Sequence, residues 1–386
     1  MTASYLVLLR RAPARRVIYA LSAAALSFGM VALTVLLTVE RSSGSYRDGG
    51  FAVAAFSLMS GVSAPFRGRL VDRRGARTWL PALSLGYCAA LVTLDLVAHA
   101  SGPSRLLVIL AGLTGATTPP VFASGRAVWP QAVEPELLRH GYAATSLLLD
   151  VGQVAGPALA SLLFIASGWI APVLCGVTGI TAALLSLPTR NPASYTHAPH
   201  PMPSLFRSRA LAGLLSVSIV LGGAQGLVQV SVPVAAGRWH HGSLAGPLLA
   251  AFAVGSVIGA VWFGSRAWKA PVIDRYLRCV LVLGLLIAPA ALARGPGSLA
   301  PLLLLAGLAF GPATISLFET LDAVVPGAGA EALTWVTTAE AAGSAVGSAV
   351  AGLLAARTGV DVPFGLASAI LVVPVGLALA LRTSRR

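Results

Sequence analysis

Charged side chains are scarce in this chain, and acidic ones are the scarcest. Aspartate and glutamate supply only 13 of the 386 residues, and all charged residues together make up 10% of the sequence. A soluble globular protein usually has about 25% charged residues, so this chain has too few to cover a soluble surface. Hydrophobic residues make up 56% of it. The composition therefore predicts an integral membrane protein.

Residues typical of metal and catalytic sites are also rare. The three cysteines, Cys88, Cys175 and Cys279, fall in separate apolar runs, which gives neither a disulfide framework nor a metal-ligand spacing. The sequence has no His-Glu-x-x-His motif, no Gly-x-Ser-x-Gly motif and no phosphate-binding loop. We therefore predict neither an enzyme nor a nucleotide-driven pump, and we expect no cofactor and no metal.

Basic residues outnumber acidic ones and give a net charge of +14. They gather in short clusters at the ends of apolar runs, where they act as topology signals. The expected partner of this charge is therefore the lipid bilayer, and nucleic acid is not expected.

Twelve apolar runs are long enough for a helix to cross the ~30 Å hydrocarbon core of a bilayer. They lie at about 17–39, 49–66, 79–100, 105–125, 141–164, 169–187, 210–236, 244–264, 272–293, 299–321, 332–356 and 362–382. With the N-terminus inside, the inner segments hold 21 basic residues and the outer segments hold six. This bias predicts a multi-pass protein of the cell's inner (plasma) membrane with both termini in the cytoplasm.

A short charged stretch from Gly68 to Arg77 separates the second and third runs. It reads Gly-Arg-Leu-Val-Asp-Arg-Arg-Gly-Ala-Arg, so that one acid, Asp72, lies among arginines. We expect a tight hairpin at the membrane surface, with Gly68 and Gly75 supplying the backbone freedom of the turn. The pattern Gly-x-Leu-x-Asp-Arg-x-Gly-x-Arg between a second and a third membrane helix resembles the signature loop of the major facilitator superfamily.

This resemblance implies an all-α integral membrane protein with twelve transmembrane helices in two pseudo-symmetric six-helix bundles. We expect the bundles at residues 1–187 and 210–386, joined by the proline-rich segment 188–209 as a cytoplasmic linker. A shift of 196 residues places residues 54–56 on 250–252 and Gly115 on Gly311. Such a repeat supports a duplication of one six-helix half.

In the superfamily, the signature loop holds the two bundles together on the cytoplasmic side. The resemblance therefore implies a gating loop formed by Gly68, Asp72, Arg73, Gly75 and Arg77. In it, Asp72 would cap the N-terminal end of the eleventh helix, near residue 332. An anion at an exposed helix N-terminus gains only about 0.3–1 kcal/mol, which is weak enough for a switch.

The loop after the fourth run resembles a second cytoplasmic feature of the superfamily, a charge relay. Its members here are Arg126, Glu136 and Arg139 in the first half and Asp322 in the second. Arg126 and Asp322 correspond by the 196-residue shift. Two unrelated charges at the membrane interface are an equally good interpretation, because snorkelling there costs little.

The fifth run contains Gly152, Gly156 and Pro157 in a Gly-x-x-x-Gly-Pro pattern. This pattern is similar to a fifth-helix motif of the superfamily that is associated with antiporters, usually exporters. Two glycines that follow the proline in the full motif are absent here. Gly343 and Gly347 give the eleventh run the same spacing, so close helix packing alone also explains the pattern.

Four acids lie within the apolar runs and are candidate proton carriers: Asp150, Glu340, Glu319 and Asp95. Burying a charge in a membrane costs at least about 2.5–3.5 kcal/mol, so each acid needs a functional or structural reason. Asp150 and Glu340 rank first because they lie near mid-depth, just before the glycine motifs. Asp95 has His99 one turn later, and a structural pair is favoured there over a proton relay.

The first, fourth, seventh and tenth helices line the substrate cavity in the superfamily. In this chain they supply seven candidates, Phe28, Thr34, Thr117, Gln225, Gln229, Thr314 and Phe318. Gln225 and Gln229 lie one turn apart on one helix face, where pointing at lipid would be costly. No basic residue lies at mid-depth, which favours a lipophilic neutral or cationic compound over an anion.

We therefore predict a monomeric secondary active transporter that works by alternating access and exports a small lipophilic compound with proton coupling. Its partners are a small-molecule substrate and protons. Proton-coupled uptake of a small metabolite and a non-transporting membrane sensor are the two alternatives.

Overall fold

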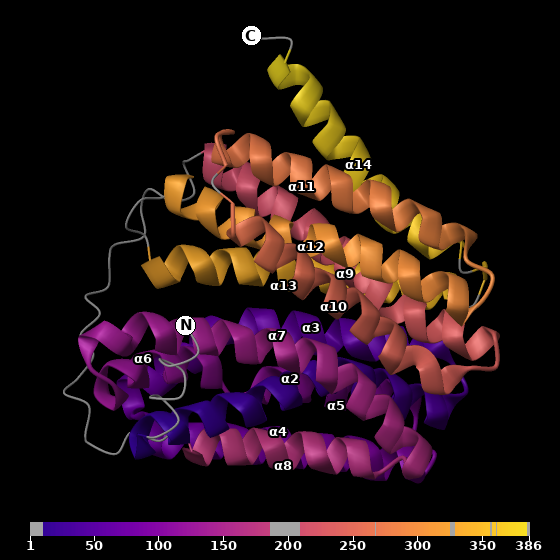
Figure 1. Ribbon diagram of the computed structural model, residues 1–386. Helices are drawn as coiled ribbons and strands as arrows, with labels where there is room; N and C mark the ends of the chain where they lie inside the picture. Colours follow the sequence, from indigo (N-terminus) through magenta and orange to yellow (C-terminus); the bar gives the residue numbers. More distant parts are fainter. Residues whose placement is uncertain are drawn as a thin grey trace.

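Helices form the whole described architecture of this chain. The computed structural model describes residues 11–185, 209–266, 268–324, 329–355, 357–359 and 361–383, and no strand occurs in these ranges. In this part of the chain, nine helices are long and apolar enough to cross a membrane, and three shorter apolar helices complete twelve crossings. The predicted all-α, twelve-helix membrane fold is confirmed (Figure 1).

Each half of the chain supplies six crossings. The first half consists of α2 (Ala12–Ser43), α3 (Tyr46–Arg74), α4 (Ala76–His99), α5 (Ser104–Thr117), α6 (Val121–Ala132), α7 (Pro135–Ala166) and α8 (Ile170–Leu185). The second consists of α9 (Arg209–Arg238), η2 (Gly242–Leu244), α10 (Ala245–Gly264), α11 (Val272–Ile287), η3 (Ala288–Leu292), α12 (Pro296–Val324), α13 (Gly329–Ala355) and α14 (Asp361–Thr383).

The fourth crossing is broken, although the sequence predicted one helix over 105–125. α5 ends at Thr117 and α6 begins at Val121. Pro119 and Pro120 explain the break, because neither has an N–H to donate and because a proline disfavours helical angles in the residue before it. α5 and α6 together form this crossing.

A single residue makes the turn between the second and third crossings. α3 stays helical to Arg74 and α4 begins at Ala76, so Gly75, with a φ of 96°, is the turn. Gly68 lies inside α3, and the expectation that it helps the chain to turn is wrong. The arginine-rich stretch extends α3 instead, because arginine is a good helix former.

The two halves repeat one pattern of helix packing. In the first half, α2 packs on α7 and α8, α3 on α5, and α4 on α5 and α8. In the second half, α9 packs on α13 and α14, α10 on α12, and α11 on α12 and α14. With α5 and α6 counted as one crossing, these are the same pairs, so the predicted pseudo-symmetry is confirmed. Figure 1 shows the two bundles side by side, the first in indigo to magenta and the second in salmon to yellow.

The boundaries between the bundles stay a prediction. Residues 186–208, which include almost all of the expected linker, lie outside the described residues, and Arg209 is already the first residue of α9.

The repeat has no constant shift. A Cβ added to Gly115 would overlap the carbonyl oxygen of Phe56, and one added to Gly307 would overlap that of Phe252. Phe56 and Phe252 are separated by 196 residues, as the predicted shift requires. The glycines that contact them are Gly115 and Gly307, so Gly115 corresponds to Gly307, about one helical turn before the expected Gly311. The break in the fourth crossing has no counterpart in the continuous α12, which allows this change of register.

Candidate functional site

The two bundles meet along two helix pairs that pseudo-symmetry relates. α7 packs on α10, and α3 packs on α13. A Cβ on Gly246 of α10 would overlap the carbonyl oxygen of Pro157 of α7, and the Gly246 N–H donates to the Ser161 hydroxyl at 2.7 Å. A Cβ on Gly50 of α3 would lie 2.7 Å from the Cα of Gly352 of α13. We call the end of the molecule with these contacts the sealed end, because such close backbone contact leaves no room for a substrate.

The opposite end of the molecule carries the turn at Gly75, and we call it the Gly75 end. The contact between α3 and α13 reaches from the sealed end to mid-depth, where the Thr338 hydroxyl lies 3.4 Å from the Gly61 carbonyl oxygen and donates to it.

The predicted glycine motif packs the first and fifth helices of each half together. A Cβ on Gly152 would overlap the carbonyl oxygen of Ala25 of α2, and one on Gly156 would lie 2.6 Å from the Cα of Gly29. The corresponding contact in the second half joins Gly343 and Gly347 of α13 to Ile219 and Gly223 of α9. Close packing therefore accounts for all four motif glycines, while Pro157 belongs to the sealed end.

Asp150 lies on the face of α7 that is turned toward the other bundle. At about 100° per residue, Asp150 shares one side of the helix with Pro157 and Ser161, which are seven and eleven residues later. Those two residues contact Gly246 of the second bundle. Asp150 lies two turns nearer the Gly75 end, and its side chain is exposed. Asp150 therefore lies on the side of α7 that is turned toward the second bundle.

Glu340 has a different environment, inside the second bundle. A Cβ on Gly222 of α9 would overlap the Glu340 carbonyl oxygen, so this part of α13 lies against α9. The Glu340 side chain is half-buried and close enough to the Tyr276 phenol of α11 for electrostatic interaction. Ser218 neighbours Tyr276, and within the described part neither buried hydroxyl completes a hydrogen bond of good geometry. Buried polar groups without partners are unusual, and they often mark a functional site.

The other two candidate proton carriers each have a basic side chain as partner. Glu319 of α12 forms an ion pair with the buried Arg275 of α11. Asp95 Oδ1 lies 3.4 Å from His99 Nδ1, near the sealed end. A paired acid has a structural reason to be present, so Asp150 and Glu340 are the stronger candidates.

The two aromatic rings are the most exposed of the predicted cavity residues. Phe28 and Phe318 are 46% and 43% exposed, and Phe28 packs edge-to-face on Phe122 with the ring centroids 6.2 Å apart. Gln225 and Gln229 are half-buried, and the described part of the chain gives neither amide a hydrogen bond. Gln225 lines a small cavity of about 10 Å³ inside the second bundle, between α9, α10, α11 and α12.

The three predicted threonines are less available. Thr34 is fully buried in the first bundle, and its hydroxyl has no partner among the described residues. The Thr117 and Thr314 hydroxyls donate to backbone carbonyls one turn earlier in their own helices, at 2.8 and 3.1 Å. A hydroxyl satisfied by its own helix does not need a substrate.

Arg67 is a buried cation that the sequence analysis did not single out. Its side chain is 7% exposed, and its guanidinium donates to the carbonyl oxygens of Ser60, Gly115 and Thr118. Two of these carbonyls lie at the end of α5, where the prolines cannot donate. Arg67 therefore stabilises the broken fourth crossing from α3. An arginine directly after the second apolar run, together with a Pro-Pro pair within the fourth run, is the signal that could have revealed it.

The gating loop and the charge relay are described only in part. Arg73, Arg77 and Asp322 have exposed side chains. The side chains of four further members lie outside the described residues, namely Asp72, Arg126, Glu136 and Arg139. The cap on α13 and the relay stay predictions.

An unexpected ion pair joins the starts of α2 and α7 at the Gly75 end. Arg11 Nη1 lies 2.8 Å from Glu134 Oε1, and Arg11 Nη2 lies 3.2 Å from Oε2. The hydrogen bonds and charge of Arg11 lower the pKa of Glu134, and Glu134 in turn raises the pKa of Arg11. The pair connects the same two helices that the glycine motif packs together.

Comparison with known proteins identifies the family. A family profile described as Major Facilitator Superfamily matches residues 17–347. The chain belongs to this superfamily. Among solved structures of similar fold, the nucleoside transporter NupG has a TM-score of 0.73 at 13% identity, and the human organic anion transporter MFSD10 (TETRAN) has 0.63 at 17%. Each comparison covers 94% of this chain and 99% of the other. These identities show the superfamily fold alone.

A curated relative gives a more specific similarity within the superfamily. The chain is 29% identical to the Enterobactin exporter EntS of Escherichia coli over 278 residues, which cover 69% of this chain and 66% of EntS. The matched part is just under two thirds of the relative's own length. Superfamily membership and the twelve apolar crossings make this chain a multi-pass membrane protein of this superfamily.

Proposed function

We propose that this transporter exports a small lipophilic neutral or cationic compound in exchange for protons. Asp150 carries the proposal, because it is an exposed acid on the face of α7 that is turned toward the other bundle. The described part of the chain gives it no ion-pair partner. An unpaired acid within a membrane-spanning segment is costly, so it is by default a functional group.

The charge distribution supports an orientation. The proposed cytoplasmic side is the Gly75 end, because the segments at that end hold 21 of the 27 basic residues. The sealed end then faces outward, both termini lie in the cytoplasm, and the protein resides in the inner (plasma) membrane as a monomer.

Alternating access supplies the transport step. Separation of Gly246 from Pro157 and of Gly50 from Gly352 would open the sealed end by a rigid rocking of the bundles. The gating loop would then close the Gly75 end, with Asp72 at the start of α13 and with Arg126, Glu136, Arg139 and Asp322 as a charge relay. Weak contacts at both ends suit a two-state equilibrium.

Competition for one carboxylate explains how protons and substrate can be coupled. A proton and a cationic compound cannot both neutralise Asp150, so binding of one favours release of the other. Glu340, with Tyr276 and Ser218 beside it, is the second proposed proton carrier. For a neutral compound the coupling would act through the conformational equilibrium, because only protonated acids can be buried cheaply as the bundles close.

The proposed cavity suits an apolar ligand with few polar groups. Phe28 and Phe318 offer exposed rings, and Gln225 and Gln229 offer unpaired amides. Similarity to EntS, which is named as an exporter, supports export. Proton-coupled uptake of a small metabolite is the second candidate, because packing alone explains the antiporter-like glycines.

Proton-coupled transport in everted membrane vesicles tests this function. Cationic and neutral lipophilic compounds are screened for collapse of an imposed pH gradient, with wild type compared with Asp150→Asn, Glu340→Gln and Asp48→Asn. Asp48→Asn is the control, because Asp48 is an acid that lies outside the proposed site. We expect wild type and this control to release protons when a compound is added. Asp150→Asn should release none. If no compound moves protons although the protein is inserted, export of this class loses its support and metabolite uptake is tested next.

A further inference from the structure

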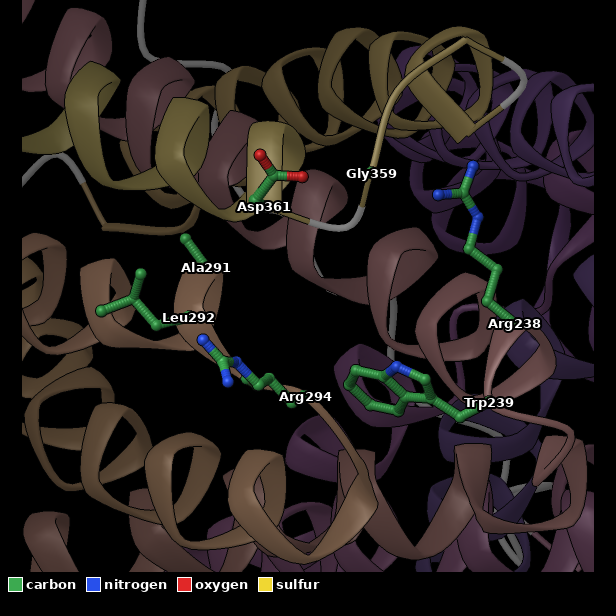
Figure 2. A pocket seen from close by; sticks show the side chains of 8 residues that line it. Arg238, Trp239, Ala291, Leu292, Arg294, Gly359 and Asp361 are labelled. Atoms are coloured by element: carbon green, nitrogen blue, oxygen red, sulfur yellow. The ribbon is translucent and has the colours of Figure 1, made fainter.

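A pocket of about 520 Å³ opens at the sealed end of the second bundle (Figure 2). The end of α9, the segment from η3 to Arg294 and the start of α14 form its walls. All of its lining residues belong to the second bundle, and none of them takes part in the contact of Gly246 with Pro157 and Ser161. Its volume lies in the range of roughly 300–1,000 Å³ that is usual for ligand sites.

Three charged side chains from three different segments surround the pocket. The Arg238 Nη2 donates to the carbonyl oxygen of Ala355 at 2.7 Å, which positions its guanidinium and leaves other N–H groups for a ligand. Arg294 and Asp361 are exposed, and within the described part neither forms an ion pair. Two cations and one anion are the complement of a group that carries a phosphate and an ammonium.

The pocket lies where hydrocarbon meets the headgroup layer. The span Leu211–Arg238 ends directly before Trp239, and the span Val272–Leu292 ends at the pocket wall. Leu292 is 80% exposed, although it closes an apolar span. A tryptophan ring prefers the interface, and an exposed leucine at this depth is suited to lipid chains.

We propose that this pocket binds the headgroup of a phospholipid that carries phosphoethanolamine. Its phosphate lies between Arg238 and Arg294, whose planar guanidinium groups suit phosphate oxygens. Its ammonium donates hydrogen bonds to Asp361, and its first acyl carbons contact Leu292. A choline headgroup has no N–H to donate to Asp361, and a glycerol headgroup has no positive charge for it. The site therefore prefers the ethanolamine lipid.

Native mass spectrometry of the purified full-length chain tests the proposal. The protein is offered equal amounts of ethanolamine, choline and glycerol phospholipids with identical acyl chains. We expect wild type to retain the ethanolamine lipid about two- to fivefold over the choline lipid, as suits one exposed charge contact. Asp361→Asn should abolish this preference while lipid still binds, and Arg294→Gln should lower retention of all three lipids.

Arg357→Gln is the matched control, because Arg357 is exposed and lies close to the pocket in sequence without lining it. This variant should keep the wild-type preference. Equal retention of the three lipids by wild type, or an unchanged preference in Asp361→Asn, would overturn the proposal. Soluble phosphoethanolamine is tested as competitor, and if it displaces the lipid at equal concentration, the pocket is a site for a soluble ligand and the lipid proposal fails.

Discussion

Arg67 shows how one side chain can stabilise an irregular element inside a membrane protein. The break between α5 and α6 leaves carbonyl oxygens without the N–H partners that a continuous helix would supply. The guanidinium of Arg67 donates hydrogen bonds to two carbonyl oxygens at this break, those of Gly115 and Thr118, and one more to Ser60 of α3. The same bonds fix the position of α5 relative to α3, directly before the gating loop.

Replacement of Arg67 should therefore destabilise the protein. We expect Arg67→Met to lower the free energy of unfolding by roughly 1–3 kcal/mol, because buried carbonyls lose their donors. Arg69→Met is the matched control, since Arg69 is exposed two residues later, and its effect should stay within about 0.5 kcal/mol. Thermal unfolding in detergent measures both, and equal stability of the two variants would contradict the assigned role of Arg67.

The ion pair between Arg11 and Glu134 predicts a pH dependence of stability. Because Arg11 lowers the pKa of Glu134 in the folded protein, the pair contributes fully above the pKa of a free glutamate, about 4.3. This contribution is lost as the pH falls through the lowered pKa and the carboxylate is protonated. Wild type should therefore lose its advantage over Glu134→Gln between about pH 5 and pH 3. Melting temperatures measured over that range test this, and a constant difference would exclude the effect.

At the scale of the helices, glycines set how closely the first and fifth crossings of each half approach. In α13, a Cβ at Gly347 would overlap the carbonyl oxygen of Gly223 of α9. In α14, a Cβ at Gly365 would meet open space. The two glycines therefore differ in packing although both lie in membrane helices.

Alanine should destabilise the protein at Gly347 but not at Gly365. Gly347→Ala should destabilise by roughly 1–3 kcal/mol, because backbone atoms must move apart. Gly365→Ala should be neutral or stabilising by up to about 1 kcal/mol, because alanine is the better helix former. Thermal unfolding of the two variants measures these changes. If Gly347→Ala were as stable as wild type, α9 and α13 would not be in close backbone contact.

The sequence predicted the helices well because membrane thickness fixes the length of each apolar run. It also predicted the motif glycines and the family from local spacing. It missed the break at Pro119 and Pro120 and the helical state of Gly68, although the two prolines and the helix propensity of arginine are local signals for them. It also missed the register of Gly307, which depends on contacts between helices. The environments of Asp150 and Glu340 could not be distinguished from the sequence, because both residues precede a glycine motif. Only the packing of the helices shows which face of each helix is turned toward the other bundle.

For the whole molecule, the sealed end is the part that must open during transport. Gly246 can contact Pro157 so closely only because glycine has no side chain. Gly242 lies in the segment between α9 and α10, and a Cβ added there would meet open space. A bulky residue at Gly246 should therefore hold the bundles apart at this end.

Gly246→Leu should reduce transport to below about a tenth of wild type while compound binding persists, because one of the two alternating states can no longer form. Gly242→Leu should transport normally. Uptake into proteoliposomes and equilibrium binding measure the two properties separately. Normal transport by Gly246→Leu would show that the sealed contact is not a gate.

We propose that, in the whole molecule, a small lipophilic compound is exchanged for protons through Asp150. The most direct test is proton flux in proteoliposomes that contain only the purified chain, with a gradient of the compound as the only driving force. We expect wild type to move protons against the compound flow and Asp150→Asn, although folded and inserted, to move no protons. Compound transport by wild type without proton movement, or normal proton coupling in Asp150→Asn, would contradict it.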